Sequence, residues 1–381
     1  MTEAEPAKKD GALYQYLPAL DGLRAISILW VLSVHWPRNL PLSELGLVKR
    51  GAFGVEIFFA ISGFLVTRSL QQCVVRARRE RGSNGAIFRD FIVRRVARIW
   101  PPYFVALLVA LAAMLFDSAT RGNFAIFQPI AWSFPTFLAN YTISRHYTPL
   151  SLLVMWSLCF EEQFYVILIV LYLIGKKSLS KYIIGLALAS IALRIVATAL
   201  HPEYFSVFVL QMEPQWRFDA IAWGCIAWIY HAPLLAFFQR PARRVLVLPI
   251  LIAMVALCYA NPENFTVRSL WYAALSPVLT ALVCVLAYAP PFWLSRMLAW
   301  SPLVLVGSIS YEMYLSHITV FRILTRLGFE RLSNLYYPLT YLCSMLVGWV
   351  FHRVFSKPAQ RLVRRWLDRA PVEAASSSSA G

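Results

Sequence analysis

Hydrophobic side chains recur along this chain in long runs, and polar residues collect in the shorter segments between them. Most runs are long enough to cross the hydrocarbon core of a bilayer as a helix, for which about 20 residues are needed. We place them near residues 20–36, 52–71, 100–117, 150–174, 182–200, 215–231, 245–260, 270–289, 303–325 and 335–355. No water-soluble fold accommodates so many apolar runs. The sequence therefore predicts an all-α, polytopic integral membrane protein with about ten transmembrane helices.

The spans also define the organisation of the chain. We expect a cytoplasmic N-terminal segment at 1–16, one transmembrane domain at 17–361 and a cytoplasmic, partly disordered tail at 362–381. The first span lacks the features of a cleaved signal peptide and is expected to remain as an anchor. The third is expected to begin at Trp100-Pro101-Pro102, because proline suits a helix start. Residues 117–149 should form the largest outward loop, which is apolar enough to lie on the membrane surface.

Composition and charge refine this assignment. Of 381 residues 59% are hydrophobic and only 14% charged, whereas soluble domains carry about 25% charged residues. The net charge of +17 would suit nucleic acid, but the basic residues cluster in alternate loops, as the positive-inside rule requires. We therefore expect a protein of the cell inner membrane with both termini cytoplasmic, in contact with lipids and not with nucleic acid. The six scattered cysteines predict neither disulfides nor a metal site.

Ionisable side chains inside apolar spans are costly, so each is a candidate for function. In the first span, Arg24 and His35 are eleven residues apart. They face the same way on a helix and are separated by roughly 16 Å along its axis. A lone histidine is often only a packing residue, but this alignment indicates a lined cavity. In the second span, close packing explains Gly54, Ser62 and Gly63 but not Glu56, which could orient a catalytic histidine.

Three arginines form a basic ridge before the third span. Arg94, Arg95 and Arg98 are spaced along one edge of an expected helix. Topology signalling and contact with lipid headgroups explain such a ridge adequately. The alternative is capture of a phosphorylated ligand, since guanidinium groups pair well with phosphate.

Later spans carry further candidates. Two adjacent carboxylates, Glu161 and Glu162, precede Tyr165 in an apolar span and are expensive unless paired, hydrated or protonated. Further along stand two more groups, which could equally be structural contacts between helices or part of a catalytic site: Arg217 with Asp219, and Tyr311 and Tyr314 with His317.

Taken together, these motifs resemble the membrane acyltransferase family 3, which includes bacterial O-antigen and exopolysaccharide O-acetylases. The resemblance extends from Leu17 to about Arg361 and depends on six motifs in order rather than on any one of them. The matching positions are Leu20-Asp21-Gly22-Leu23-Arg24 with His35, Gly54-Val55-Glu56 with Ser62-Gly63-Phe64, Arg94-Arg95 and Arg98 with Pro101 and Tyr103, Trp156-Ser157-Leu158 with Glu161 to Tyr165, Arg217-Phe218-Asp219 with Gly224, and Ser310-Tyr311 with Tyr314 and His317.

The resemblance implies transfer of an acyl group, usually acetyl, from acyl-CoA to a hydroxyl on an acceptor, commonly a sugar. Acyl-CoA is then a co-substrate, and no permanently bound cofactor is expected. His35 would be the key catalytic residue, and Arg24, Arg95 and Arg98 would be required. Glu56 stands where many members carry aspartate, and Ser356 stands before Lys357-Pro358 where the family often has an acidic residue. Some relatives add an extracytoplasmic SGNH hydrolase-like domain, for which this chain is too short.

We expect Arg94, Arg95 and Arg98, with Arg24, to hold the CoA phosphates near the inner face. His35 would act as general base on the acceptor hydroxyl, oriented by Glu56, or would itself carry the acyl group. Glu161 and Glu162 would line the cavity or bind the acceptor. Two other interpretations remain at this point. A transporter or flippase could use the same buried Arg, Glu and His residues, and a non-catalytic scaffold would have no evident need of them.

Overall fold

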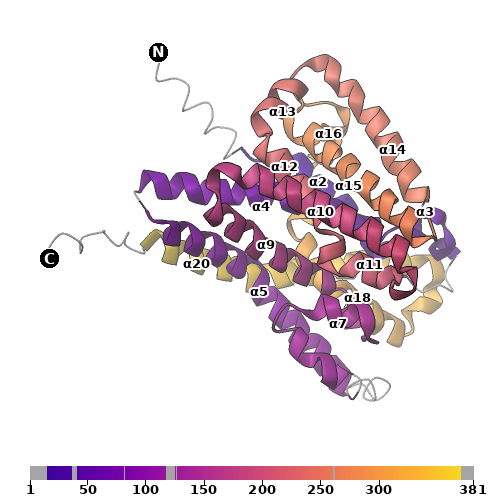
Figure 1. Ribbon diagram of the computed structural model, residues 1–381. Helices are drawn as coiled ribbons and strands as arrows, with labels where there is room; N and C mark the ends of the chain where they lie inside the picture. The colour runs from indigo at the N-terminus through magenta and orange to yellow at the C-terminus, as the bar shows by residue number, and fades with distance from the viewer. Residues whose placement is uncertain are drawn as a thin grey trace, which may run out of the picture.

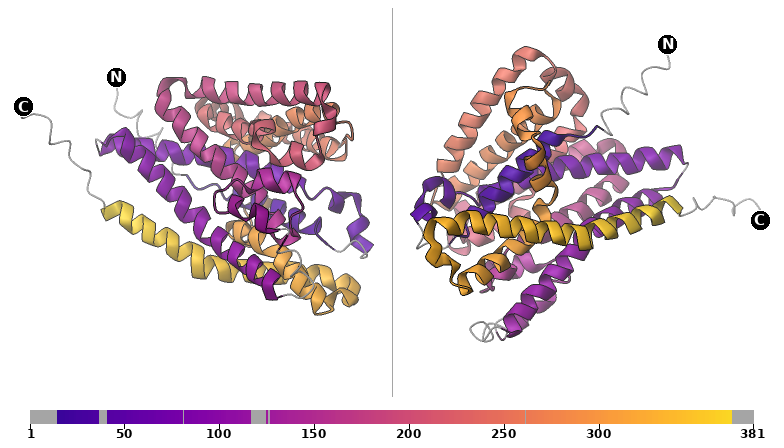
Figure 2. Two further views of the ribbon diagram at one scale, coloured as in Figure 1. Left: turned by 60° about the horizontal axis from the view of Figure 1, so that its bottom comes forward. Right: turned by 180° about the vertical axis from the view of Figure 1, so that it is seen from behind.

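The computed structural model describes residues 15–36, 41–80, 82–116, 125, 127–260 and 262–369, so the expectations for 1–14 and 370–381 lie outside it. Throughout the described residues the regular elements are helices (Figures 1 and 2). α2 and α4 run through the centre, with the α13–α15 group on one side and α5, α9 and α18–α20 on the other. Buried apolar side chains form two clusters that follow this division. The expected all-α fold is confirmed.

The α-helices have these bounds: α2 (Pro18–Ser33), α3 (Gly46–Lys49), α4 (Phe53–Arg79), α5 (Asn84–Phe116), α7 (Ala139–Arg145), α8 (Leu150–Leu153), α9 (Trp156–Ile174), α10 (Leu179–Leu200), α11 (Val207–Met212), α12 (Phe218–Ile229), α13 (His231–Phe238), α14 (Val247–Ala260), α15 (Phe265–Tyr288), α16 (Trp293–Leu298), α17 (Ser301–Ser308), α18 (Ser310–Arg326), α19 (Tyr336–Phe351) and α20 (Lys357–Arg369). A π-helical turn, η8 (His352–Ser356), joins α19 to α20. Short 3₁₀ turns are η1 (Pro41–Glu44), η2 (Gln128–Ser133), η3 (Lys176–Ser178), η4 (Pro202–Tyr204), η5 (Pro214–Trp216), η6 (Pro241–Leu246) and η7 (Phe329–Leu335).

Six helical segments of the described chain are long and apolar enough to cross a membrane, and eight if two bent pairs each count as one span. The bent pairs are α12 with α13, at 75°, and α17 with α18, at 72°. α2 and α19 have 16 residues each, or about 24 Å of helix against a hydrocarbon core of about 30 Å. A multi-pass membrane protein is therefore supported, whereas the expected count of about ten is not confirmed.

Glycines let the central helices approach until their backbones touch. A Cβ added at Gly63 of α4 would lie 2.0 Å from the carbonyl oxygen of Ile221 on α12. Gly224 of α12 meets Ala60 of α4 in the same way, with 2.2 Å to its carbonyl oxygen. Gly54 is equally close to α2, at 2.5 Å from the carbonyl oxygen of Ser27. The packing role expected for Gly54 and Gly63 is confirmed.

The third apolar span does not begin at Trp100. α5 begins at Asn84 and continues through Pro101 and Pro102 to Phe116. The two prolines remove two helix hydrogen bonds and favour a bend, but the preceding polar turns stay helical because they pack against α4 and α20. α5 and α20 lie side by side in both views of Figure 2.

Residues 127–149 pack in part against other helices of the protein. Phe134 and Asn140 are fully buried, and α7 packs against α9 and α11. Glu213, at the end of α11, accepts a 2.7 Å hydrogen bond from Nε of Arg145 on α7. This bond raises the pKa of the Arg145 guanidinium above its usual value. The segment is held by a specific polar contact that its apolar composition does not reveal.

The glycine contacts between α4 and α12 predict a loss of stability when they are filled. Gly63→Ala forces the helices apart, and overpacking of this kind costs about 1–3 kcal/mol. We expect a lower midpoint of thermal unfolding for the purified protein in detergent. Gly185→Ala on α10 is the matched control, because no atom lies within 4 Å of its added Cβ and alanine favours helix. Equal midpoints for the two variants would contradict this packing.

Candidate active site

A cavity lies where five helices meet. Each of α2, α4, α5, α9 and α18 contributes to its wall. The polar side chains that line it are Arg24, Ser62, Arg95, Arg98, Ser157, Glu161, Tyr165, Ser310, Tyr311 and Tyr314. Most of these were selected from the sequence, on segments up to about 290 residues apart along the chain. We refer to this space as the inner cavity.

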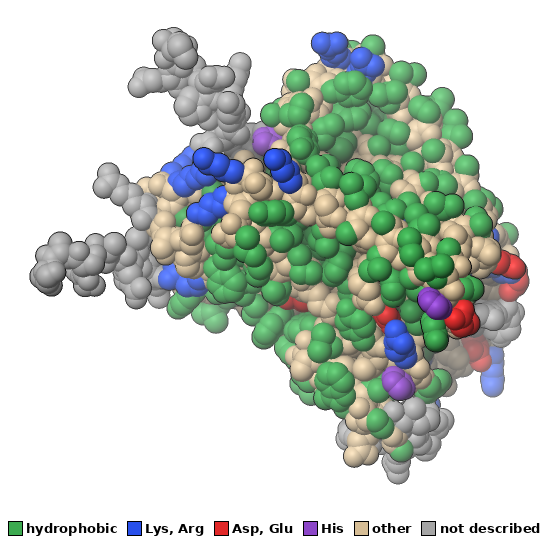
Figure 3. Space-filling model, viewed as in Figure 1, with side chains coloured by type: hydrophobic (Ala, Val, Ile, Leu, Met, Phe, Trp, Pro, Cys, Tyr) green, Lys and Arg blue, Asp and Glu red, His purple; other side chains and the backbone are tan. Residues whose placement is uncertain are grey.

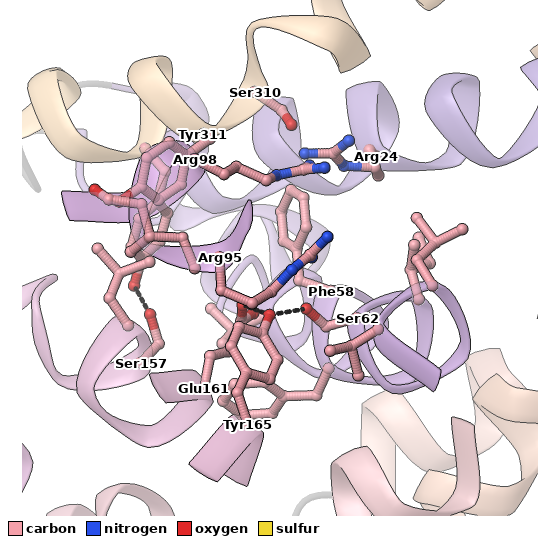
Figure 4. Close-up of a pocket in the computed structure, with 18 residues that line it drawn as sticks. Arg24, Phe58, Ser62, Arg95, Arg98, Ser157, Glu161, Tyr165, Ser310 and Tyr311 are labelled. Atoms are coloured by element: carbon pink, nitrogen blue, oxygen red, sulfur yellow. Dashed lines mark hydrogen bonds between the residues drawn. The ribbon is translucent and has the colours of Figure 1, made fainter. Parts of the chain in front are cut away.

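Positive charge dominates the inner cavity. The guanidinium groups of Arg24 and Arg98 lie beside one another, and that of Arg95 points toward them (Figure 4). Glu161 is the only acidic residue among the described lining. Outside the lining, Arg24 is 3.5 Å from the carboxylate of Asp21, and Arg95 donates to the hydroxyl of Ser69. Three guanidiniums facing one carboxylate favour an anionic ligand.

Hydroxyl groups fix the other polar atoms of the wall. Tyr165 donates a 2.6 Å hydrogen bond to Glu161, and Ser62 lies 3.0 Å from the same phenol oxygen (Figure 4). Ser157 donates to the phenol of Tyr314 at 2.8 Å. The carboxylate of Glu161 is thus hydrogen-bonded to a tyrosine of the same wall.

His35 lines a second cavity, which we call the outer cavity. No described residue lines both cavities. The link between them is His317, whose ring centroid is 5.0 Å from that of His35 and 5.8 Å from that of Tyr314. Tyr314 faces the inner cavity and His35 faces the outer one. The sequence predicts one cavity shared by Arg24 and His35, whereas the structure places them in two cavities with His317 between them.

Hydrogen bonds set the protonation of this pair. Nδ1 of His317 lies 2.7 Å from the carbonyl oxygen of Tyr314, and Nδ1 of His35 lies 3.0 Å from that of Val31. A carbonyl only accepts, so both Nδ1 atoms carry hydrogen. Nε2 of His317, 3.4 Å from Nδ1 of His35, is then an acceptor when neutral. Nε2 of neutral His35 keeps a lone pair, as a general base requires.

The expected contact between Glu56 and His35 is wrong. The carboxylate of Glu56 accepts a hydrogen bond from the guanidinium of Arg217, which is fully buried. That guanidinium also stacks on Tyr272, at 3.5 Å from the ring centroid. The arginine lies 161 residues away from Glu56 in sequence, whereas His35 was expected as the partner because a carboxylate can orient a catalytic histidine. Glu56 is therefore part of a buried ion pair.

Asp219 forms a second buried ion pair, with Arg194 of α10. Nη1 of Arg194 donates to Asp219 at 2.7 Å, and both side chains are fully buried. Arg217 and Asp219 line neither cavity, so the structural role left open for them fits the geometry. Sequence analysis missed Arg194, although an arginine in an apolar span met the criterion applied elsewhere.

Two further candidates also lie outside the inner cavity. Glu162 accepts a hydrogen bond from the indole of Trp100 at 3.3 Å and faces away from its neighbour Glu161. Arg94 lines a separate basic hollow with Gln72, Arg76 and Arg79. Consecutive residues of a helix differ by about 100° in direction, so one member of each adjacent pair reaches the cavity and the other does not.

The sequence profile of the family described as an acyltransferase domain matches residues 17–353. The chain belongs to acyltransferase family 3. The profile covers the helices that form both cavities, from α2 to α19. No solved structure matches the chain.

Curated members of acyltransferase family 3 resemble this chain over most of its length. YrhL of Bacillus subtilis (strain 168), provisionally named a peptidoglycan O-acetyltransferase, is 27% identical over 81% of this chain and 49% of its own length. Peptidoglycan O-acetyltransferase OatA of Listeria monocytogenes is 26% identical over 82% of this chain and 50% of its own. The chain thus spans about half the length of these relatives.

The ion pair of Arg194 and Asp219 predicts a large cost for removing one partner. Asp219→Ala leaves a buried guanidinium without its carboxylate, which should reduce the free energy of unfolding by about 3–5 kcal/mol. Glu44→Ala, which breaks a pair with Lys49 whose side chains are 54% and 59% exposed, should cost about 0–1 kcal/mol. Thermal unfolding in detergent compares the two variants. An Arg194→Met, Asp219→Leu double variant should recover most of the loss, and failure of Asp219→Ala to destabilise would exclude a structural pair.

Proposed function

We propose that this protein is a membrane-embedded O-acyltransferase that moves an acyl group, acetyl in the first instance, from acyl-CoA to a hydroxyl of a carbohydrate or glycoconjugate. The family supports acyl transfer, and the names of the relatives support a carbohydrate acceptor. The observation that carries the proposal is the contact of His35 with His317, which joins an arginine-lined cavity to a second cavity. No comparable observation supports the alternative function, a transporter or flippase.

We assign the inner cavity to the donor. CoA is polyanionic, and Arg24, Arg95 and Arg98 provide three guanidiniums that suit its phosphates. The inner cavity would open to the cytoplasm, where CoA is found. Lys and Arg gather where α4 ends and α5 begins, and over the connection from α13 to α14, while Asp and Glu lie near α11 (Figure 3). This distribution supports an inner-membrane protein with that end cytoplasmic.

The chemistry assigned to His35 follows from its tautomer. Nε2 takes the proton of the acceptor hydroxyl as that oxygen attacks the thioester carbonyl. The new C–O bond forms, the C–S bond breaks, and the proton returns from the imidazolium to the CoA thiolate. His317 holds Nδ1 of His35 by its Nε2 and would stabilise the positive ring. Tyr311 and Tyr314 lie along the path between the cavities.

An acyl-histidine intermediate is the alternative route within the same function. The two routes differ when acceptor is absent. Radiolabelled acetyl-CoA incubated with purified protein would then leave one equivalent of label on His35 by the covalent route and none by general-base catalysis. Peptide mapping of the label distinguishes them.

His35→Ala tests the catalytic assignment. Loss of the base should lower kcat for transfer of labelled acetyl from acetyl-CoA into the glycan fraction of membranes by about 10²–10⁴-fold. KM for acetyl-CoA should change little, because the arginines remain. His201→Ala is the control, since that histidine is 60% exposed at the end of α10. Wild-type turnover by His35→Ala would refute the proposal.

Arg98→Gln tests the donor site. A hydrogen bond to a charged group contributes about 1.5–3 kcal/mol, so KM for acetyl-CoA should rise roughly 10-fold or more with a much smaller change in kcat. Arg296→Gln, at an exposed position of α16, should leave both constants unchanged. An unchanged KM in Arg98→Gln would exclude this cavity as the phosphate site.

A further inference from the structure

A third cavity lies where two candidate membrane spans end and another begins. Its wall is formed by the second half of α4, the end of α9, η3 with the start of α10, and the junction of α12 with α13. None of the described residues that line it lines the inner or the outer cavity. The proposed transfer reaction therefore gives this space no role. We call it the third cavity.

Basic side chains surround the third cavity without an acidic counterpart in its wall. Arg78 comes from α4, and Lys176 and Lys177 come from η3, directly after α9. All three side chains are exposed, and no acidic residue is among the described residues that line the cavity. The amino group of Lys176 donates to the amide oxygen of Asn84 and lies 5.9 Å from the ring centroid of Tyr172, and both of these partners are neutral. A negatively charged ligand would balance this wall.

The floor of the third cavity is apolar, in contrast to its rim. Leu70, Val74 and Trp228 line it and are buried. The indole of Trp228 stacks on His231 with 4.9 Å between the ring centroids, and its nitrogen donates a 2.6 Å hydrogen bond to the amide oxygen of Gln71. An apolar floor below a cationic rim suits an amphiphile with a hydrocarbon chain and an anionic head.

The location of the third cavity indicates which amphiphile is available. Arg78 is the last residue but one of a candidate span, and Lys176 is the first of another. Span ends lie at the level of the lipid headgroups. The positive-inside rule explains why basic residues are frequent there, but it does not require them to share a cavity with buried apolar side chains. Arg240 follows the same rule outside this wall.

We propose that the third cavity binds one anionic phospholipid, whose phosphate lies at Arg78, Lys176 and Lys177 and whose acyl chain lies against the apolar floor. Basic pockets between membrane helices bind phosphate headgroups of lipids. The amide nitrogen of Gln71 can donate hydrogen bonds to oxygens of the headgroup. The site is thus a lipid-binding site separate from both cavities assigned to acyl transfer.

A lipid in the third cavity would connect the two halves of the fold. Leu70 and Tyr172 belong to one buried apolar cluster and Trp228 to the other, and all three line this cavity. A ligand that binds the folded protein and not the unfolded chain raises the midpoint of thermal unfolding. This readout does not involve acyl transfer, so the inference and the proposed function fail independently.

Lipid binding to the purified full chain tests the inference. The protein is freed of lipid in a neutral detergent, and dioleoylphosphatidylglycerol or dioleoylphosphatidylcholine is added. We expect the anionic lipid to bind at least about 10-fold more tightly, to remain bound in native mass spectra and to raise the midpoint of unfolding further. Its advantage should shrink as salt is added.

Variants locate the binding site. Arg78→Gln and Lys177→Gln should each weaken binding of phosphatidylglycerol about 5-fold, which is the contribution of one basic residue near an anionic lipid. Arg78→Lys keeps the charge and should retain most of the affinity. Arg240→Gln is the matched control, because Arg240 is exposed before η6 and does not line the third cavity. It should bind the lipid as the wild type does.

Equal affinities for the two lipids would overturn the inference. Full affinity in an Arg78→Gln, Lys177→Gln double variant would also overturn it, as would equal weakening by Arg240→Gln, because the charge of the whole surface would then decide binding. A soluble phosphate carries the same charge, so glycerophosphoglycerol, the headgroup without acyl chains, is titrated as well. It should bind more than about 10-fold more weakly, because it leaves the apolar floor uncovered. Binding as tight as that of the lipid would indicate a site for soluble phosphate and would exclude a lipid site.

Discussion

A charged side chain within the hydrocarbon of a bilayer is stable only where an opposite charge, a hydrogen-bonding group or water replaces its lost hydration. The helices of this protein meet that requirement in two ways. Glu56 with Arg217, and Asp219 with Arg194, neutralise each other in buried pairs. Arg24, Arg95, Arg98 and Glu161 instead face a cavity. The first group supports the fold, and only the second is available for a ligand.

Because of this division, the residues assigned to catalysis and to donor binding lie in two neighbouring cavities rather than in one pocket. Arg24 on α2 and His35 just beyond the end of that helix line different cavities, and Tyr314 and His317 lie between them. A polyanionic donor and a sugar acceptor therefore need not share a chamber. The thioester carbonyl and the hydroxyl must still meet, so the acyl group has to pass Tyr314 and His317 to reach the oxygen that His35 deprotonates.

Much of the site could be predicted from the sequence, because the cost of charge in lipid marks the residues that matter. Arg24 and Glu161 were found in this way, whereas Arg95, Arg98 and the tyrosines were selected from their spacing and from the family motifs. What each residue touches could not be predicted, since periodicity relates positions on one helix only. Glu56 was assigned to His35, but its partner Arg217 directly precedes α12.

Some predicted span ends differ from the observed helix ends for related physical reasons. Pro101 and Pro102 favoured a helix start, but contacts with α4 and α20 keep the preceding turns helical. α2 begins at Pro18 and ends at Ser33, and His35 lies in the turn that follows. Contacts between helices determine where these helices begin and end, and the hydropathy pattern of a single segment carries no information about such contacts.

The backbone contacts of α2 determine where substitutions would impair activity. Gly51 and Gly54 hold this helix against α4, and Gly22 and Gly307 hold it against α16 and α17. Because one rigid helix carries Arg24 and leads directly to His35, displacement at any of these glycines shifts both cavities together. Loss-of-function alleles should therefore arise at small residues that touch no substrate, and selection should tolerate little drift there.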